Sequence, residues 1–129
     1  MGDLAELIER VEKATGPDRE LDFDVAVFAG ELPAEAAKYG PYLRRITQRY
    51  VEPYSSAVDP VLALILRRLP GWEVNFTATD GVALDVYLIG PKYRDDRPGE
   101  ESSPPVGGKP VALALLLAFL KATQHQEKK

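Results

Sequence analysis

The first residues of the chain place apolar and charged side chains on opposite faces of a helix. Four apolar residues recur at the i, i+3, i+4, i+7 spacing: Leu4, Leu7, Ile8 and Val11. Charged side chains fill the other face, so the spacing predicts an amphipathic helix over residues 3–15. Gly16 then stands where a left-handed helix cap is expected, and Pro17 cannot continue the turn.

Residues 18–29 fit either a strand or a helix, because their apolar positions alternate at first and also share one helical face. Leu21, Phe23, Val25 and Val27 alternate as in a strand, whereas Leu21, Val25 and Phe28 fall on one helical face. Asp18 precedes them as a residue type that caps helices, and Gly30 closes the stretch at a reasonable length. The pattern therefore favours a helix, followed by a short helical turn over residues 34–38.

Residues 42–50 carry aromatic and β-branched side chains, which favour a strand. Leu43, Ile46 and Tyr50 would also share a helix face. We predict a strand here and keep the helix as the alternative.

A heavily apolar helix is expected over residues 60–69. It has two candidate starts: Ser56 with Asp59 as a capping box, or Asp59 as the cap with Pro60 at the first helical position. We prefer Asp59 as the cap, because proline is tolerated where its missing amide has no intrahelical partner.

Residues 72–89 show the clearest β pattern. Two alternating apolar and polar runs flank Asp80-Gly81, a pair that accepts the positive φ angles of a tight turn. The pattern predicts a hairpin with one covered face and one more polar face.

The C-terminal third begins with residues 90–108, where prolines, glycines and serines predict a flexible loop. The next helix, over residues 110–123, has no polar residue between Val111 and Leu120. It is too short to span a bilayer and must be covered on more than one side, by the sheet and a helix or by a second subunit. Residues 124–129 are expected to be a solvated tail.

These elements predict one α+β domain over residues 1–129. A small antiparallel sheet, made of the hairpin and the strand at 42–50, is expected between the helices as an α/β/α sandwich. A chain of 129 residues with 45% hydrophobic and 28% charged residues suits such a domain.

Composition narrows the function classes. The net charge of −4 disfavours nucleic acid as a partner, and the absence of cysteine removes disulfides and thiolate chemistry. The N-terminal residues are acidic and amphipathic, unlike a secretory signal, so a cytoplasmic protein with no membrane association is expected.

Three stretches carry a family resemblance: "ELIERVEKATGPDRELD", "EPYSSAVDPVLALILRRLPGW" and "KPVALALLLAFLKA". In that order they resemble the small bacteriophage and prophage proteins of the phage ABA sandwich domain family. The resemblance implies a sheet layered between helices and a phage origin. Pro60 stands where relatives more often have alanine, and "LRRITQRY" has no matching part. The family has no established catalytic residues, so the resemblance implies no residue roles.

An acidic run is the first candidate for chemistry: Asp18, Glu20, Asp22 and Asp24. On a helix the first and third of these face differently from the second and fourth, and the glycine and terminal glutamate of a calcium loop are missing. We therefore predict no metal and no cofactor. Asp22, among apolar neighbours, is expected to accept hydrogen bonds from a nearby backbone amide or arginine in a structural role.

A cluster of arginines and tyrosines is the second candidate, because these residue types are enriched at protein interfaces. We predict an interaction surface made of Tyr42, Arg44, Arg45, Arg49 and Tyr54, with Arg67 and Arg68 as possible neighbours. The alternative is that the arginines are ordinary solvated residues. Ser55 and Ser56 have no histidine in the folded part to activate them, and helix capping explains at least one.

Two functions follow from these features. The preferred one is a phage or prophage accessory protein that acts as an interaction module, binding a host or phage protein and able to form a homodimer through its apolar helices. The other is a small metal- or nucleotide-dependent hydrolase or ligand-binding protein using the acidic run or the arginines.

Overall fold

The computed structural model describes residues 3–90 and 107–127. The elements in chain order are α1 (Asp3–Lys13), α2 (Arg19–Phe28), the 3-10 helix η1 (Ala34–Lys38), α3 (Pro41–Gln48), α4 (Val58–Arg68), β1 (Glu73–Thr79), β2 (Val82–Ile89) and α5 (Val111–Glu127). The predicted α+β class is confirmed. The described part has five α-helices and one antiparallel hairpin.

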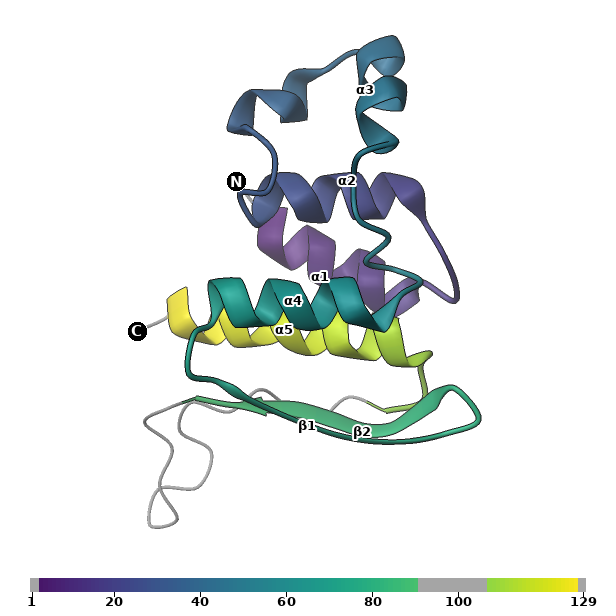
Figure 1. Cartoon of the computed structure of the whole chain (residues 1–129), viewed down its shortest axis with the longest axis vertical. Helices are drawn as coiled ribbons and strands as arrows, with labels where there is room; N and C mark the ends of the chain where they lie inside the picture. Colours follow the sequence, from purple (N-terminus) through teal and green to yellow (C-terminus); the bar gives the residue numbers. More distant parts are fainter. Residues whose placement is uncertain (1–2, 91–106, 128–129) are drawn as a thin grey trace.

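The helices are stacked on one side of the hairpin (Figure 1). Helix α5 packs on β2 and contacts both α1 and α4, while α1 packs on α2 and α2 packs on η1 and α3. Helix α3 therefore lies at the end of the molecule opposite the hairpin. In the part of the chain that the structure describes, the hairpin is an outer layer rather than the middle of a sandwich.

Helix α5 is the centre of the core, and the prediction of a helix at 110–123 is confirmed. Residues 112–120 are all buried, as an uninterrupted apolar run requires. Two ways to cover this helix were predicted, by the sheet and a helix or by a second subunit. The structure shows the first: β2, α1 and α4 pack against it. The helix also continues beyond the predicted end through Glu127, into the stretch predicted as a tail.

The predicted hairpin is confirmed. Asp80 and Gly81 adopt φ angles of 54° and 79° and connect Thr79 to Val82 in a two-residue turn, the geometry that favours Asp-Gly. A register shift beside Thr77 leaves Leu84 as the extra residue on β2. Most of the predicted loop at 90–108 lies outside the described residues.

The helix predicted at 18–29 is α2, and Asp18 caps it as expected. Its side chain accepts a hydrogen bond from the Leu21 amide at 3.1 Å. The prediction for Gly16 and Pro17 is wrong in detail. Helix α1 already ends at Lys13, and the φ of Gly16 is not in the left-handed region. Both residues lie in the connection rather than closing the helix.

Asp59 does not cap α4. The helix begins at Val58 with Ala57 at the N-cap position, and no side chain caps it. Pro60 is the third helical residue, where an amide would also lack an intrahelical partner. Asp59 lies in the first turn, where its charge is favourable near the helix N-terminus.

The strand predicted at 42–50 is wrong, because this segment forms helix α3. Pro41 occupies its first turn and none of its residues is buried. Strand propensity mainly reflects packing on a half-buried sheet, and here no strand lies beside the segment in the described sheet. The alternative prediction of a helix, based on Leu43, Ile46 and Tyr50, describes this segment better than the strand does.

Candidate functional site

Helix α3 is held to the domain through polar side chains. The Arg44 guanidinium donates to Glu20 and to Asp24 on α2, both at 2.7 Å, and lies 4.1 Å from the centre of the Phe23 ring. Gln48, one turn further, donates to Glu20. The face of α3 toward α2 is therefore its polar face.

The exposed side chains of this segment point away from α2. Successive helical residues are about 100° apart, so Tyr42 lies about 160° around the helix from Arg44, Arg49 about 140° and Arg45 about 100°. We call this the outward face of α3 and define it as Tyr42, Leu43 and Arg45 on the helix together with Arg49 and Tyr50 directly after its end. The exposed fractions of its apolar residues are 73% for Tyr42, 46% for Leu43 and 83% for Tyr50.

Two residues of the predicted interaction surface, Arg44 and Tyr54, do not lie on the outward face of α3. Arg44 is engaged by α2, and Tyr54 is buried in the core with 1% of its surface exposed. Burial raises the pKa of the Tyr54 hydroxyl, with the Glu31 charge adding to the effect. Burial alone would lower the pKa of Arg44, but its hydrogen bonds to Asp24 and Glu20 outweigh this and raise it. The structure keeps Tyr42, Arg45 and Arg49 at the surface and adds Leu43 and Tyr50.

The acidic run divides between two partners, as the helix geometry predicted. Glu20 and Asp24 bind Arg44, and Asp24 also accepts from Arg10 on α1 at 2.6 Å. Asp18 and Asp22 instead face the segment around Ser55. The four carboxylates therefore do not converge. Within the described residues, no group of three or more acidic, histidine or cysteine side chains could hold a metal ion.

A second polar arrangement joins α2 to the segment between α3 and α4, and we call it the Ser55 clasp. It consists of Asp18, Arg19, Asp22 and Ser55. The Ser55 amide donates to Asp22 Oδ1 at 2.7 Å, and the Asp18 amide donates to Ser55 Oγ at 2.8 Å. Arg19 donates to Asp22 Oδ2 at 2.9 Å and to the Val51 carbonyl at 2.7 Å. The predicted structural role of Asp22 is confirmed, with a backbone amide and an arginine as donors.

Ser55 is fixed by this clasp, which accounts for its burial at 2% exposure. Ser56 is exposed, and its hydroxyl lies 3.5 Å from the Pro53 carbonyl. Neither serine caps α4, so that part of the prediction is wrong.

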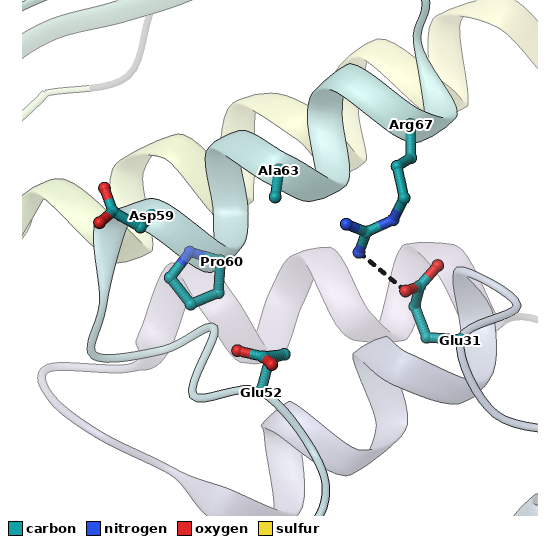
Figure 2. Close-up of a pocket in the computed structure, with 6 residues that line it drawn as sticks. All are labelled: Glu31, Glu52, Asp59, Pro60, Ala63 and Arg67. Carbon is teal, nitrogen blue, oxygen red and sulfur yellow. Dashed lines mark hydrogen bonds and ion pairs between the residues drawn. The ribbon is translucent and has the colours of Figure 1, made fainter.

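Arg67 and Arg68 lie away from α3. Both donate to Glu31, at 2.7 and 2.5 Å. Arg67 and Glu31 also line a pocket of about 430 Å³ with Glu52, Asp59, Pro60 and Ala63 (Figure 2). Figure 2 shows the carboxylates of Asp59 and Glu52 apart from each other and from the Glu31–Arg67 pair. The acidic groups that line the pocket therefore do not point to one common position.

Glu31 gives a testable pH effect. Burial alone would raise its pKa, but hydrogen bonds from Arg68 and Arg67 outweigh this and hold the pKa below the ordinary 4.5. A lowered pKa contributes stability above the ordinary value and loses it as pH falls through the folded value. We expect Glu31→Gln to cost about 0.5–1 kcal/mol near neutral pH, after solvent screening. The difference from wild type should vanish in urea titrations well below pH 4.5. A constant difference at every pH would contradict the ion pair.

Comparisons of the chain with protein-family models, with curated proteins and with solved structures find no match. The phage origin that the sequence resemblance implies therefore stays a prediction. Among the helices described, none is long and apolar enough to cross a bilayer.

Proposed function

We propose that this protein is an interaction module that binds a partner protein through the outward face of α3. The partner would offer an apolar groove with acidic groups at its rim. Under the family resemblance, it is a host or phage protein.

One observation carries this proposal: α3 turns its polar face inward and its aromatic face outward. A surface helix ordinarily buries its apolar face against the domain. Here Arg44 and Gln48 make the inward contacts, while Tyr42 and Tyr50 are 73% and 83% exposed. Three large apolar side chains are thus exposed within nine residues, and exposed apolar surface that is contiguous marks interaction sites.

The residue types of the outward face suit binding. Tyrosine and arginine supply much of the affinity at protein interfaces, because each combines a large contact area with polar groups. Arg45 and Arg49 are exposed, and among the described residues their side chains have no ion pair or hydrogen bond, so both guanidiniums are available to acidic groups. Arg45 and Arg49 are spaced i, i+4, which is a spacing by which a groove on a partner protein recognises one face of a helix.

Quantitative capture from a lysate of the producing cell tests the proposal. We expect Tyr42→Ala and Arg49→Glu each to reduce capture of the wild-type partner by about tenfold or more, the loss typical of a central interface residue. Matched controls are Leu66→Ala, at another exposed apolar residue on α4, and Lys13→Glu, a charge reversal on α1. Both controls should capture as wild type does. Capture that survives both α3 substitutions would contradict the proposal.

A further inference from the structure

In the part of the chain that the structure describes, the sheet has two strands, and nothing pairs with β1 on the side away from β2. We call this side the open edge of β1. The far edge of β2 is different. Its Ala83 amide donates to the Lys109 carbonyl at 2.7 Å, and its carbonyl accepts from the Gly108 amide at 2.8 Å.

The orientation of Ala83 identifies which groups of β1 face the open edge. Since both polar backbone groups of Ala83 point away from β1, Ala83 and its partner Ala78 are a non-hydrogen-bonded pair. The amide and carbonyl of Ala78 therefore point away from β2. Orientation alternates along a strand, so Phe76 and Val74 present their amides and carbonyls to the same open edge.

This edge lacks the features that usually prevent strand pairing. Natural edge strands carry lysine, proline or a bulge that blocks a neighbour. Residues 73–79 contain no lysine and no proline, and the extra residue of the bulge is on β2. The single charge is Glu73 at one end, and the central Phe76 is 45% exposed.

We propose that two copies of this chain pair through β1 in antiparallel orientation, with the two-fold axis at Phe76. Phe76 then lies opposite the partner's Phe76, and Val74 lies opposite the partner's Ala78. All of these residues present their backbone groups to the edge, so each pair exchanges two hydrogen bonds. The two hairpins become one four-stranded sheet.

Charge favours this arrangement of a second copy. In the antiparallel register Glu73 lies opposite the partner's Thr79, which keeps the two carboxylates at opposite ends of the interface. A parallel, in-register pairing would place the two Glu73 carboxylates side by side, which is unfavourable. The apolar helix α5 offers no competing interface, because its residues 112–120 are buried within one chain.

Sedimentation equilibrium over a concentration series tests the proposal with charge variants of the full chain. Wild type should form a dimer. Phe76→Lys and Phe76→Glu should each lose it, because like charges would lie directly opposite each other. An equimolar mixture of F76K and F76E should restore a dimer containing one chain of each. Thr79→Lys is the matched control on the same strand, and it should keep or tighten the dimer since it faces the partner's Glu73.

Circular dichroism establishes that each variant is folded, and Ala78→Pro supplies a second disruption that removes only an outward amide. Wild type that stays monomeric at millimolar concentration would overturn the proposal. So would a dimer that persists in F76K, a mixture that fails to reassociate, or loss of the dimer in Thr79→Lys. A dimer broken by Tyr42→Ala but not by Phe76→Lys would assign the contact to α3 instead. Capture of a partner through α3 should be unaffected by Phe76→Lys, so the two proposals fail separately.

Discussion

Leu116→Ala in α5 is expected to lower the free energy of unfolding by about 3 kcal/mol. Leu116 is fully buried, on the helix that contacts β2, α1 and α4. Removing its side-chain carbons loses their transfer free energy and leaves a cavity that surrounding elements only partly close. Because three elements meet on α5, none can collapse into the cavity without losing contacts elsewhere.

Urea denaturation at fixed protein concentration measures this loss, since association would otherwise change apparent stability. Leu66→Ala is the matched control: it is the same substitution on a neighbouring helix, at a leucine that is 70% exposed. Its cost should stay within about 0.5 kcal/mol, as for other surface substitutions. Equal losses for both leucines would mean that α5 is not the centre of the core.

Most of the fold could be predicted from local pattern. The uninterrupted apolar run of α5 allows only a helix covered on several sides, and the Asp80-Gly81 turn between alternating runs allows little but a hairpin. Helix α2 could be chosen over a strand because Asp18 is a capping residue. In each case the signal lies within a few residues of the element it defines.

For α3, local pattern offered both a strand and a helix and favoured the wrong one. Its β-branched and aromatic residues resemble a strand, and what holds it as a helix is distant in sequence. Arg44 and Gln48 bind Glu20 and Asp24, 20 to 28 residues earlier in the chain. Tertiary contacts of this kind, ion pairs and hydrogen bonds, override weak local propensity.

The candidate surface was predicted in part, for the same reason. Composition alone groups Tyr42, Arg45 and Arg49 with Arg44 and Tyr54. Only the rotational phase of α3 separates the first three, which point outward, from Arg44, which points to α2. Tyr54 lies beyond α3, is buried in the core, and precedes Ser55 of the Ser55 clasp.

The Ser55 clasp had one local signal, the acidic Asp22 among apolar residues. Its partner Ser55 is 33 residues away, and nothing near Ser55 marks it as a donor. In the sequence, Arg19 is also indistinguishable from an ordinary exposed residue in the first turn of a helix. Its contact with the Val51 carbonyl depends on the placement of α3.

Asp22→Ala is expected to cost about 3 kcal/mol at neutral pH, because a buried amide and an arginine lose their acceptor together. The side chain of Asp22 is fully buried, so water cannot readily replace it at the Ser55 amide. Asp22→Asn keeps an oxygen for that amide, but its NH2 group replaces the oxygen that accepts from Arg19. Its cost should be smaller, about 1 kcal/mol. Equal losses in the two variants would show that the charge, not the acceptor, holds the clasp.

The pH dependence of the same pair of proteins separates the two contributions further. Burial raises the pKa of Asp22 above the ordinary 3.8, although hydrogen bonds from Ser55 and the charge of Arg19 oppose the shift. A raised pKa means that the folded protein binds the proton more tightly, so this contribution is present below the ordinary value and is lost as pH rises through the folded pKa. The stability advantage of wild type over Asp22→Asn should therefore shrink as pH rises from 3.8. An advantage that grows over this range in urea titrations would mean that Arg19 stabilises the carboxylate more than burial destabilises it.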